Sequence, residues 1–162
     1  MPRRAVYTGS FDTVTLGHLD VIERGSQLFD EFIVGVGVNP DKSSLFTAEE
    51  RVDLLQRVTR SLGNVTIKSF SGLAVKFVRD CDARIILRGV RSLSDMEAEF
   101  TMTLANSKLD PDVETVFLMA GDQYSHVSSS LIKQITPLAN DVEMARFVPA
   151  EIIPDLRVKL GG

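Results

Sequence analysis

The chain has 162 residues, of which 44% are hydrophobic and 25% are charged, a mixture typical of a folded domain and not of a disordered segment. Lysine and arginine number 18 against 22 acidic residues, and the net charge of −4 argues against a protein that coats nucleic acid or anionic membrane. The single cysteine, Cys81, cannot form an intrachain disulfide, and no Cys/His cluster has zinc spacing. With no signal peptide and no apolar run of membrane length, we expect one cytoplasmic domain over residues 1–162.

Short apolar runs alternate along the chain with longer segments of helical periodicity. We expect strands at residues 5–7, 32–38, 65–68, 84–87 and 115–119. Possible capping boxes, Thr47 with Glu50 and Ser94 with Glu97, predict two of the helix starts. After Ser128 we expect helix to the end of the chain, with Pro149 opening a last short helix.

This alternation predicts an α/β fold. Specifically, we expect a doubly wound, Rossmann-like, five-stranded parallel sheet with helices on both faces and a helical C-terminus. In such sheets ligands bind outside the carboxyl ends of the strands, so the loops that follow the strands are expected to carry the site.

The loop after the first strand, residues 8–18, is rich in small and hydroxyl-bearing side chains and runs into a helix. Backbone N–H groups and the positive end of the helix dipole can meet an anion there, although the loop matches neither a Walker motif nor a dinucleotide fingerprint. A lone histidine such as His18 more often packs against its neighbours or caps a helix than takes part in a functional site. Because its helical turn faces the strand ends, we expect a neutral N–H donor beside Ser10.

Polar residues also follow the later strands. Lys42 by itself is a weak signal, since most loop lysines are solvated, whereas the two arginines of residues 88–91 suit a triphosphate or a phosphate ester. Arg88 continues a buried run and should therefore have a partner. Glu99 could be solvated, or could hold a ribose hydroxyl or an arginine. The serines at 128–130 are flanked by apolar residues and open a helix, which favours an anion-binding turn.

Four motifs together resemble those of the nucleotidyltransferase α/β-phosphodiesterase superfamily and, within it, of the bacterial phosphopantetheine adenylyltransferases: Gly9-Ser10-Phe11-Asp12, Thr15-Leu16-Gly17-His18, Arg88-Gly89-Val90-Arg91 and Ser128-Ser129-Ser130-Leu131. The resemblance implies transfer of the adenylyl group of ATP to 4′-phosphopantetheine, giving dephospho-coenzyme A and pyrophosphate. It implies Mg²⁺ bound mainly through the ATP phosphates, a homohexamer and feedback binding of coenzyme A. No nucleic-acid or membrane partner is expected.

The resemblance also implies roles for individual residues. It makes Ser10, His18, Lys42 and Arg88 catalytic, and it places the acceptor against Ser10, Lys42, Ala74 and Arg88. The ATP-binding residues that it implies are Ser10, Phe11, His18, Gly89, Val90, Arg91, Glu99, Tyr124, Ser125, His126, Val127, Ser128, Ser129 and Ser130. No side-chain metal ligand and no covalent enzyme intermediate are expected. Thr8, Thr13 and His126 depart from the common pattern.

Two alternatives remain open at this point. Another member of the superfamily, such as a nicotinate-mononucleotide adenylyltransferase or a cytidylyltransferase, would share the nucleotide motifs but not the acceptor residues Lys42, Ala74 and Arg88. A non-catalytic nucleotide-binding module would bind nucleotide without releasing pyrophosphate, and it would not need His18 or Lys42.

Overall fold

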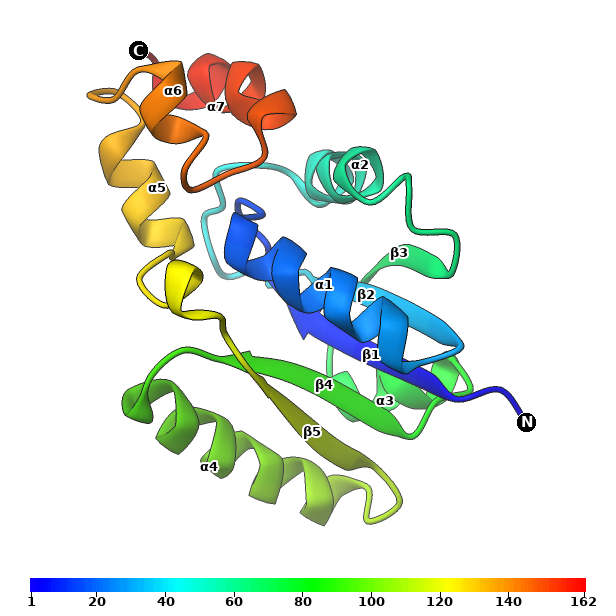
Figure 1. Cartoon of the computed structure of the whole chain (residues 1–162). Coiled ribbons are helices and arrows are strands. Elements are labelled where there is room, and N and C mark those ends of the chain that lie inside the picture. Colours follow the sequence, from blue (N-terminus) through cyan, green and yellow to red (C-terminus); the bar gives the residue numbers. More distant parts are fainter.

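The computed structural model describes residues 1–162 and has at its centre one parallel sheet with the strand order β3-β2-β1-β4-β5 (Figure 1). The strands are β1 (Arg4–Gly9), β2 (Glu31–Gly37), β3 (Val65–Phe70), β4 (Ile85–Val90) and β5 (Glu114–Met119). The predicted strands and the predicted fold class are confirmed.

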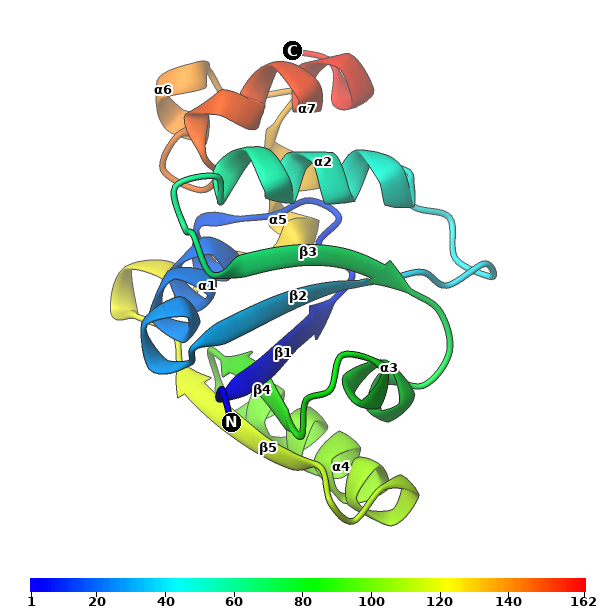
Figure 2. The same cartoon turned by 90° about the vertical axis from the view of Figure 1, so that its right-hand side faces the viewer.

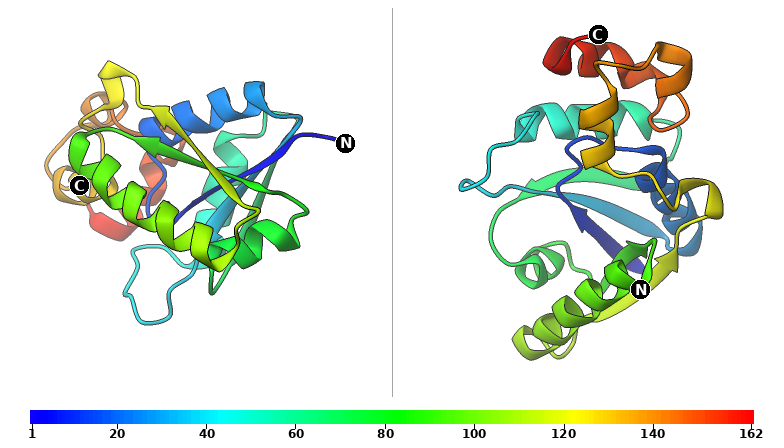
Figure 3. Two further views of the ribbon diagram at one scale, coloured as in Figure 1. Left: turned by 90° about the horizontal axis from the view of Figure 1, so that it is seen from below. Right: turned by 90° about the vertical axis from the view of Figure 1, so that its left-hand side faces the viewer.

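Helices cover both faces of the sheet. They are α1 (Leu16–Leu28), α2 (Ala48–Val58), α3 (Ala74–Asp80), α4 (Leu93–Leu109), α5 (Ser129–Ile135), α6 (Asp141–Met144) and α7 (Ile153–Leu160), with 3₁₀ turns η1 (Asp122–Tyr124) and η2 (Ala150–Ile152). Helices α1 and α2 lie on one face and α3 and α4 on the other, while α6 and α7 stack beyond α2 (Figures 2 and 3). No helix combines the length and the apolar character that a membrane crossing requires.

The chain changes faces between β3 and β4, which makes the neighbouring pair β1 and β4 the switch point of the sheet. Strand β2 is buried along its length because apolar clusters cover it on both sides, as the continuous apolar run predicts. Strand β5 is an edge strand, and its side chains are exposed or only partly buried. The ends of β1 and β4 are therefore where a ligand site is expected.

Local signals set most helix starts, with one correction. The Thr47 box is confirmed, since Thr47 accepts from the Glu50 N–H at 3.1 Å and Glu50 accepts from the Thr47 N–H at 2.8 Å. The start expected at Ser94 is wrong, because Ser92 caps α4 by accepting from the Asp95 N–H at 3.1 Å.

The C-terminal segment is helical only in pieces. Pro149 precedes the η2 turn, and Pro154 lies in the first turn of α7, where a missing N–H costs nothing. The loops between α5, α6 and α7 let these short helices fold back over α2 (Figure 3).

Candidate active site

Three adjoining cavities open at the carboxyl ends of β1 and β4, and Ser10 lines all of them. The main cavity, about 380 Å³, lies between the first loop, the 88–91 segment and the serines at 128–130. The apolar cavity, about 420 Å³, includes Phe70, Leu73, Ala74 and Met102. The lysine cavity, about 290 Å³, has no hydrophobic lining and contains Lys42.

Most of the residues expected at the nucleotide meet in the main cavity: Ser10, Phe11, His18, Gly89, Arg91, Glu99, Val127, Ser128, Ser129 and Ser130. Arg88, expected at the acceptor phosphate, lines this cavity and the apolar one. Four expected residues, Val90, Tyr124, Ser125 and His126, line none of the three cavities. Val90 is buried, and the exposed His126 packs edge-on against Phe147 with ring centroids 6.0 Å apart. His126 departs from the common pattern, and its imidazole still packs against an aromatic ring.

His18 stands in the first turn of α1 and is held by a capping box with Thr15. The Thr15 hydroxyl accepts from the His18 N–H at 3.2 Å, and the Thr15 N–H donates to His18 Nδ1 at 3.1 Å. Because Nδ1 acts as an acceptor, the proton of the neutral ring lies on Nε2. The imidazole, which lines the main cavity, thus carries an N–H donor on Nε2.

Burial lowers the pKa of His18 from 6.5 to about 4, and the positive charges of Arg91 and Arg88 act in the same direction. The neutral histidine expected from the sequence is confirmed. The main cause is desolvation, to which the neighbouring arginines add.

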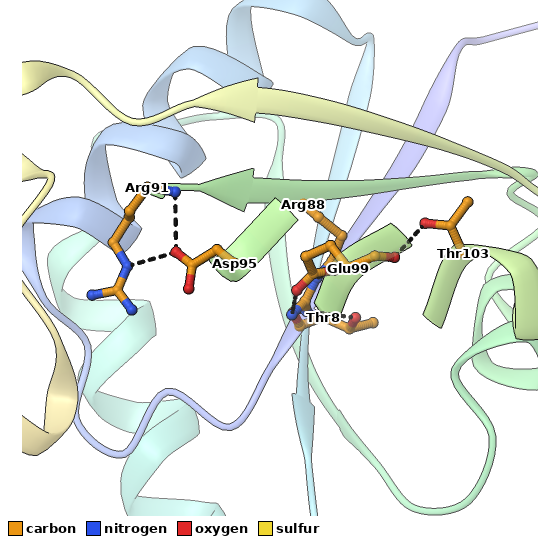
Figure 4. A network of polar contacts seen from close by, with 6 residues as sticks. All are labelled: Thr8, Arg88, Arg91, Asp95, Glu99 and Thr103. Atoms are coloured by element: carbon orange, nitrogen blue, oxygen red, sulfur yellow. Dashed lines mark hydrogen bonds and ion pairs between the residues drawn. The ribbon is translucent and has the colours of Figure 1, made fainter. Parts of the chain in front are cut away.

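Arg88 is held in place by Glu99, which reaches it from α4 (Figure 4). Two parallel hydrogen bonds join them: Arg88 Nε to Glu99 Oε2 at 2.9 Å and Arg88 Nη2 to Glu99 Oε1 at 2.6 Å. Arg88 Nη1 also donates to the Thr8 carbonyl. Burial acts against the charged form, but the bonds to Glu99 outweigh it and raise the pKa of the Arg88 guanidinium. The partner predicted for Arg88 is therefore Glu99. The second N–H of Nη2 makes no bond to Glu99 and can donate to a ligand.

Arg91 connects two of the motifs. Its Nε donates to Asp95 at 3.1 Å, and its Nη1 donates to the Val127 carbonyl at 2.6 Å (Figure 4 shows the Asp95 contact). Asp95 also accepts from the Arg91 N–H at 3.1 Å. The start of α4 and the approach to α5 are thus fixed relative to each other across the main cavity.

The three serines divide their roles. Ser128 caps α5 by accepting from the Leu131 N–H at 3.2 Å, and the Ser129 hydroxyl donates to the Thr13 carbonyl at 2.8 Å. The Ser130 hydroxyl makes no hydrogen bond within the chain and lines both the main and the lysine cavities. Thr13, one of the departures from the common pattern, is fully buried, and its hydroxyl has no hydrogen-bond partner.

Two buried side chains to which the sequence analysis gave no individual role hold the first loop. Arg51 Nη1 donates to the carbonyls of Ser10, at 2.8 Å, and Gly37, at 3.2 Å. Asp12 accepts from the N–H groups of Leu45, at 2.8 Å, and Phe46, at 2.9 Å, and so ties the loop that carries Lys42 to the first loop.

The capping role of Thr15 and the ion pair of Asp95 were also missed, although the spacing of these residues could have revealed both. Thr15 precedes His18 by three residues, the spacing of a capping box, and Asp95 follows Arg91 by four, the spacing of a helical ion pair. Arg51 and Asp12 have no comparable local signal, because their partners lie far away in the sequence.

The carboxylates around the cavities are already engaged. Glu99 binds Arg88, Asp95 binds Arg91, and Asp12 binds two N–H groups and lies 3.4 Å from Lys133 Nζ. The structure contains no group of three or more His, Cys, Asp or Glu side chains arranged for a metal ion. The side chains of the site therefore do not form a dedicated cage for a divalent cation.

Sequence comparisons assign the family. The cytidylyltransferase-like family model matches residues 6–135. A phosphopantetheine adenylyltransferase from Rhodopirellula baltica is 58% identical over 157 residues, which cover 96% of this chain and 88% of the relative. One from Clostridium botulinum strain Eklund 17B is 53% identical over 152 residues, 94% of each chain. The chain belongs to the phosphopantetheine adenylyltransferase family. It is an enzyme of the nucleotidyltransferase class.

A solved structure of Plasmodium falciparum nicotinic acid mononucleotide adenylyltransferase, complexed with NaAD, superimposes with a TM-score of 0.59 at 15% identity, covering 98% of this chain and 96% of the other. At that identity the likeness shows the shared fold alone. The choice of acceptor must be argued from the acceptor side of the site.

Proposed function

We propose that the chain transfers the adenylyl group of ATP to 4′-phosphopantetheine, releasing dephospho-coenzyme A and pyrophosphate. The observation that carries the proposal is the junction of three unlike cavities at Ser10. The main cavity supplies Arg91 and the neutral His18 for a triphosphate, and Arg88, which also lines the apolar cavity, for the acceptor phosphate. The apolar cavity, which Ala74 lines, suits a pantetheine arm. The lysine cavity, which contains Lys42, shares Ser10 with it. A nicotinate mononucleotide would make little use of an apolar cavity of this size.

In the proposed reaction the acceptor phosphate attacks the α-phosphorus of ATP in line, and pyrophosphate leaves. That phosphate is already a nucleophile at neutral pH, so the protein needs no general base and forms no covalent intermediate. Ser10, Lys42 and Arg88 hold the attacking phosphate, while His18 Nε2–H donates to the α-phosphate as its charge develops. Catalysis then depends on positioning and electrostatic stabilisation.

The nucleotide is proposed to bind through the backbone of Ser10 and Phe11, through Gly89 and Arg91, and through residues 127–130, all of which line the main cavity. Glu99 lies beside it, and because both of its carboxylate oxygens bind Arg88, we assign its contribution to the orientation of that arginine. Mg²⁺ is proposed to bind mainly through the ATP phosphates, whose charge it neutralises, since the neighbouring carboxylates already have partners.

Further assignments rest on the family and on surface chemistry. We propose one nucleotidyltransferase domain over residues 1–162, feedback binding of coenzyme A in the same cavities, and a cytoplasmic location, to which the single thiol of Cys81 is suited. We also propose a homo-oligomer, a hexamer by family, that buries apolar side chains exposed on α4 outside the cavities: Leu93, Phe100 and Leu104.

The reaction is tested by incubating the protein and Mg²⁺ with ATP or CTP, combined with 4′-phosphopantetheine or nicotinate mononucleotide, and identifying products by mass spectrometry. We expect dephospho-coenzyme A from ATP and 4′-phosphopantetheine only. A cytidylyl product, or a dinucleotide formed from nicotinate mononucleotide, would replace the proposal by one of the related activities. ATP binding without any product would indicate a non-catalytic module.

A further inference from the structure

Tyr7 lies near the carboxyl end of the central strand β1 and borders the main cavity. Its side chain is 6% exposed, and its ring packs edge-on against Phe11 with centroids 5.2 Å apart. The Phe11 ring in turn packs edge-on against His18 at 5.0 Å. The three rings form one continuous wall that ends at the histidine.

The Tyr7 hydroxyl makes no hydrogen bond within the chain, yet it is not sealed in the interior. The residue beside it on the neighbouring strand β4 is Gly89, which has no side chain to cover the hydroxyl. A Cβ at this position would lie 3.9 Å from the hydroxyl oxygen and 2.9 Å from Val21 Cγ2. Buried hydroxyl groups nearly always have a hydrogen-bond partner. The main cavity, which Tyr7 borders, offers the space for such a partner.

The surroundings define what that partner should be. Burial raises the pKa of Tyr7 to about 12, with the charges of Arg88, Glu99 and Arg91 acting as smaller effects, so the hydroxyl stays protonated and can donate. The two arginines favour an anion in the same space. Tyr7 lines the main cavity but neither the apolar nor the lysine cavity, which assigns it to the nucleotide and not to the acceptor.

We propose that Tyr7 is a further nucleotide-binding residue, whose hydroxyl donates a hydrogen bond to a phosphate oxygen of the bound nucleotide. The inference rests on the proposed function, because it takes the main cavity to be the ATP site. It adds a contact from the sheet itself to those made by the loops, on the same wall as His18.

Tyr7→Phe tests the proposal, since it removes the hydroxyl and keeps the ring that packs against Phe11. We expect the Kd for ATP, measured by calorimetry without acceptor, to rise about tenfold, as for one hydrogen bond to a charged group. Binding of adenosine, which has no phosphate, should not change, nor should the unfolding temperature fall. Thr59→Val is the matched control: it deletes a buried hydroxyl that donates to the Leu55 carbonyl at 2.7 Å at the C-terminal end of α2, and should leave the ATP Kd unchanged.

An ATP affinity of Tyr7→Phe within about twofold of the unaltered protein would overturn the inference, because a lost charged hydrogen bond exceeds that range. Equal weakening of ATP and adenosine would also overturn it, since it would mean a general disturbance of the cavity. Pyrophosphate release by the unaltered protein is measured in parallel. That assay decides the proposed reaction, whereas the paired affinities decide the role of Tyr7.

Discussion

The held, neutral state of His18 has a consequence for stability that can be measured. Its pKa is about 4 in the folded protein and 6.5 when the imidazole is free. Below pH 6.5 the unfolded chain therefore takes up a proton that the folded protein refuses, and stability must fall as the pH falls. Between about pH 7.5 and about pH 5 the loss from this one group is about 2 kcal/mol.

His18→Gln is the perturbation that isolates this effect. Glutamine at the third helical position can accept from the Thr15 N–H and preserve the capping box, but it does not titrate. Urea unfolding followed by circular dichroism, at one protein concentration, should show that the unaltered protein loses about 2 kcal/mol more than the variant over this pH range. The carboxylates that titrate in the same range are common to both proteins and cancel. Equal pH dependence of the two proteins would refute the depressed pKa of His18.

Three further predictions concern other parts of the structure. Ser92→Ala should lower the free energy of unfolding by about 1 kcal/mol and Ser94→Ala by much less, which thermal or urea unfolding of the pair will check. Glu99→Gln should destabilise the fold by about 2 kcal/mol, because Arg88 loses its charged partner. In steady-state assays it should raise the KM for 4′-phosphopantetheine more than the KM for ATP. If the variant and the unaltered protein have the same KM for 4′-phosphopantetheine, Glu99 does not orient Arg88 for the acceptor. Phe100→Glu should shift the mass measured by light scattering towards the monomer, and an unchanged mass would remove α4 from the oligomer interface.

The fold was largely predictable because its strands are short, apolar and separated by periodic helices. Strand β2 illustrates this, as burial on both faces leaves an uninterrupted apolar run. The start of α4 was not predictable locally, because Ser92 with Asp95 and Ser94 with Glu97 offer two registers of similar quality. The tertiary contact between Asp95 and Arg91 accompanies the first register.

For the site, the expectation that ligands bind at the carboxyl ends of the strands identified the right loops. It could not predict where the side chains of these loops would lie. It left Glu99 with three possible roles, and only the position of α4 over β4 pairs it with Arg88. It could not foresee that Lys42 and Ala74 would line separate cavities, because that depends on where the loops settle. The unpaired hydroxyl of Tyr7 was likewise invisible, since the sequence shows only one aromatic residue in a buried strand.

The most direct test of the account is pyrophosphate release from ATP and Mg²⁺, measured with and without 4′-phosphopantetheine for the unaltered protein and for His18→Ala. The account predicts release that requires the acceptor and that falls about 10²–10³-fold in the variant, the effect of removing one preorganised donor. Acceptor-independent release, or near-normal turnover without His18, would contradict it.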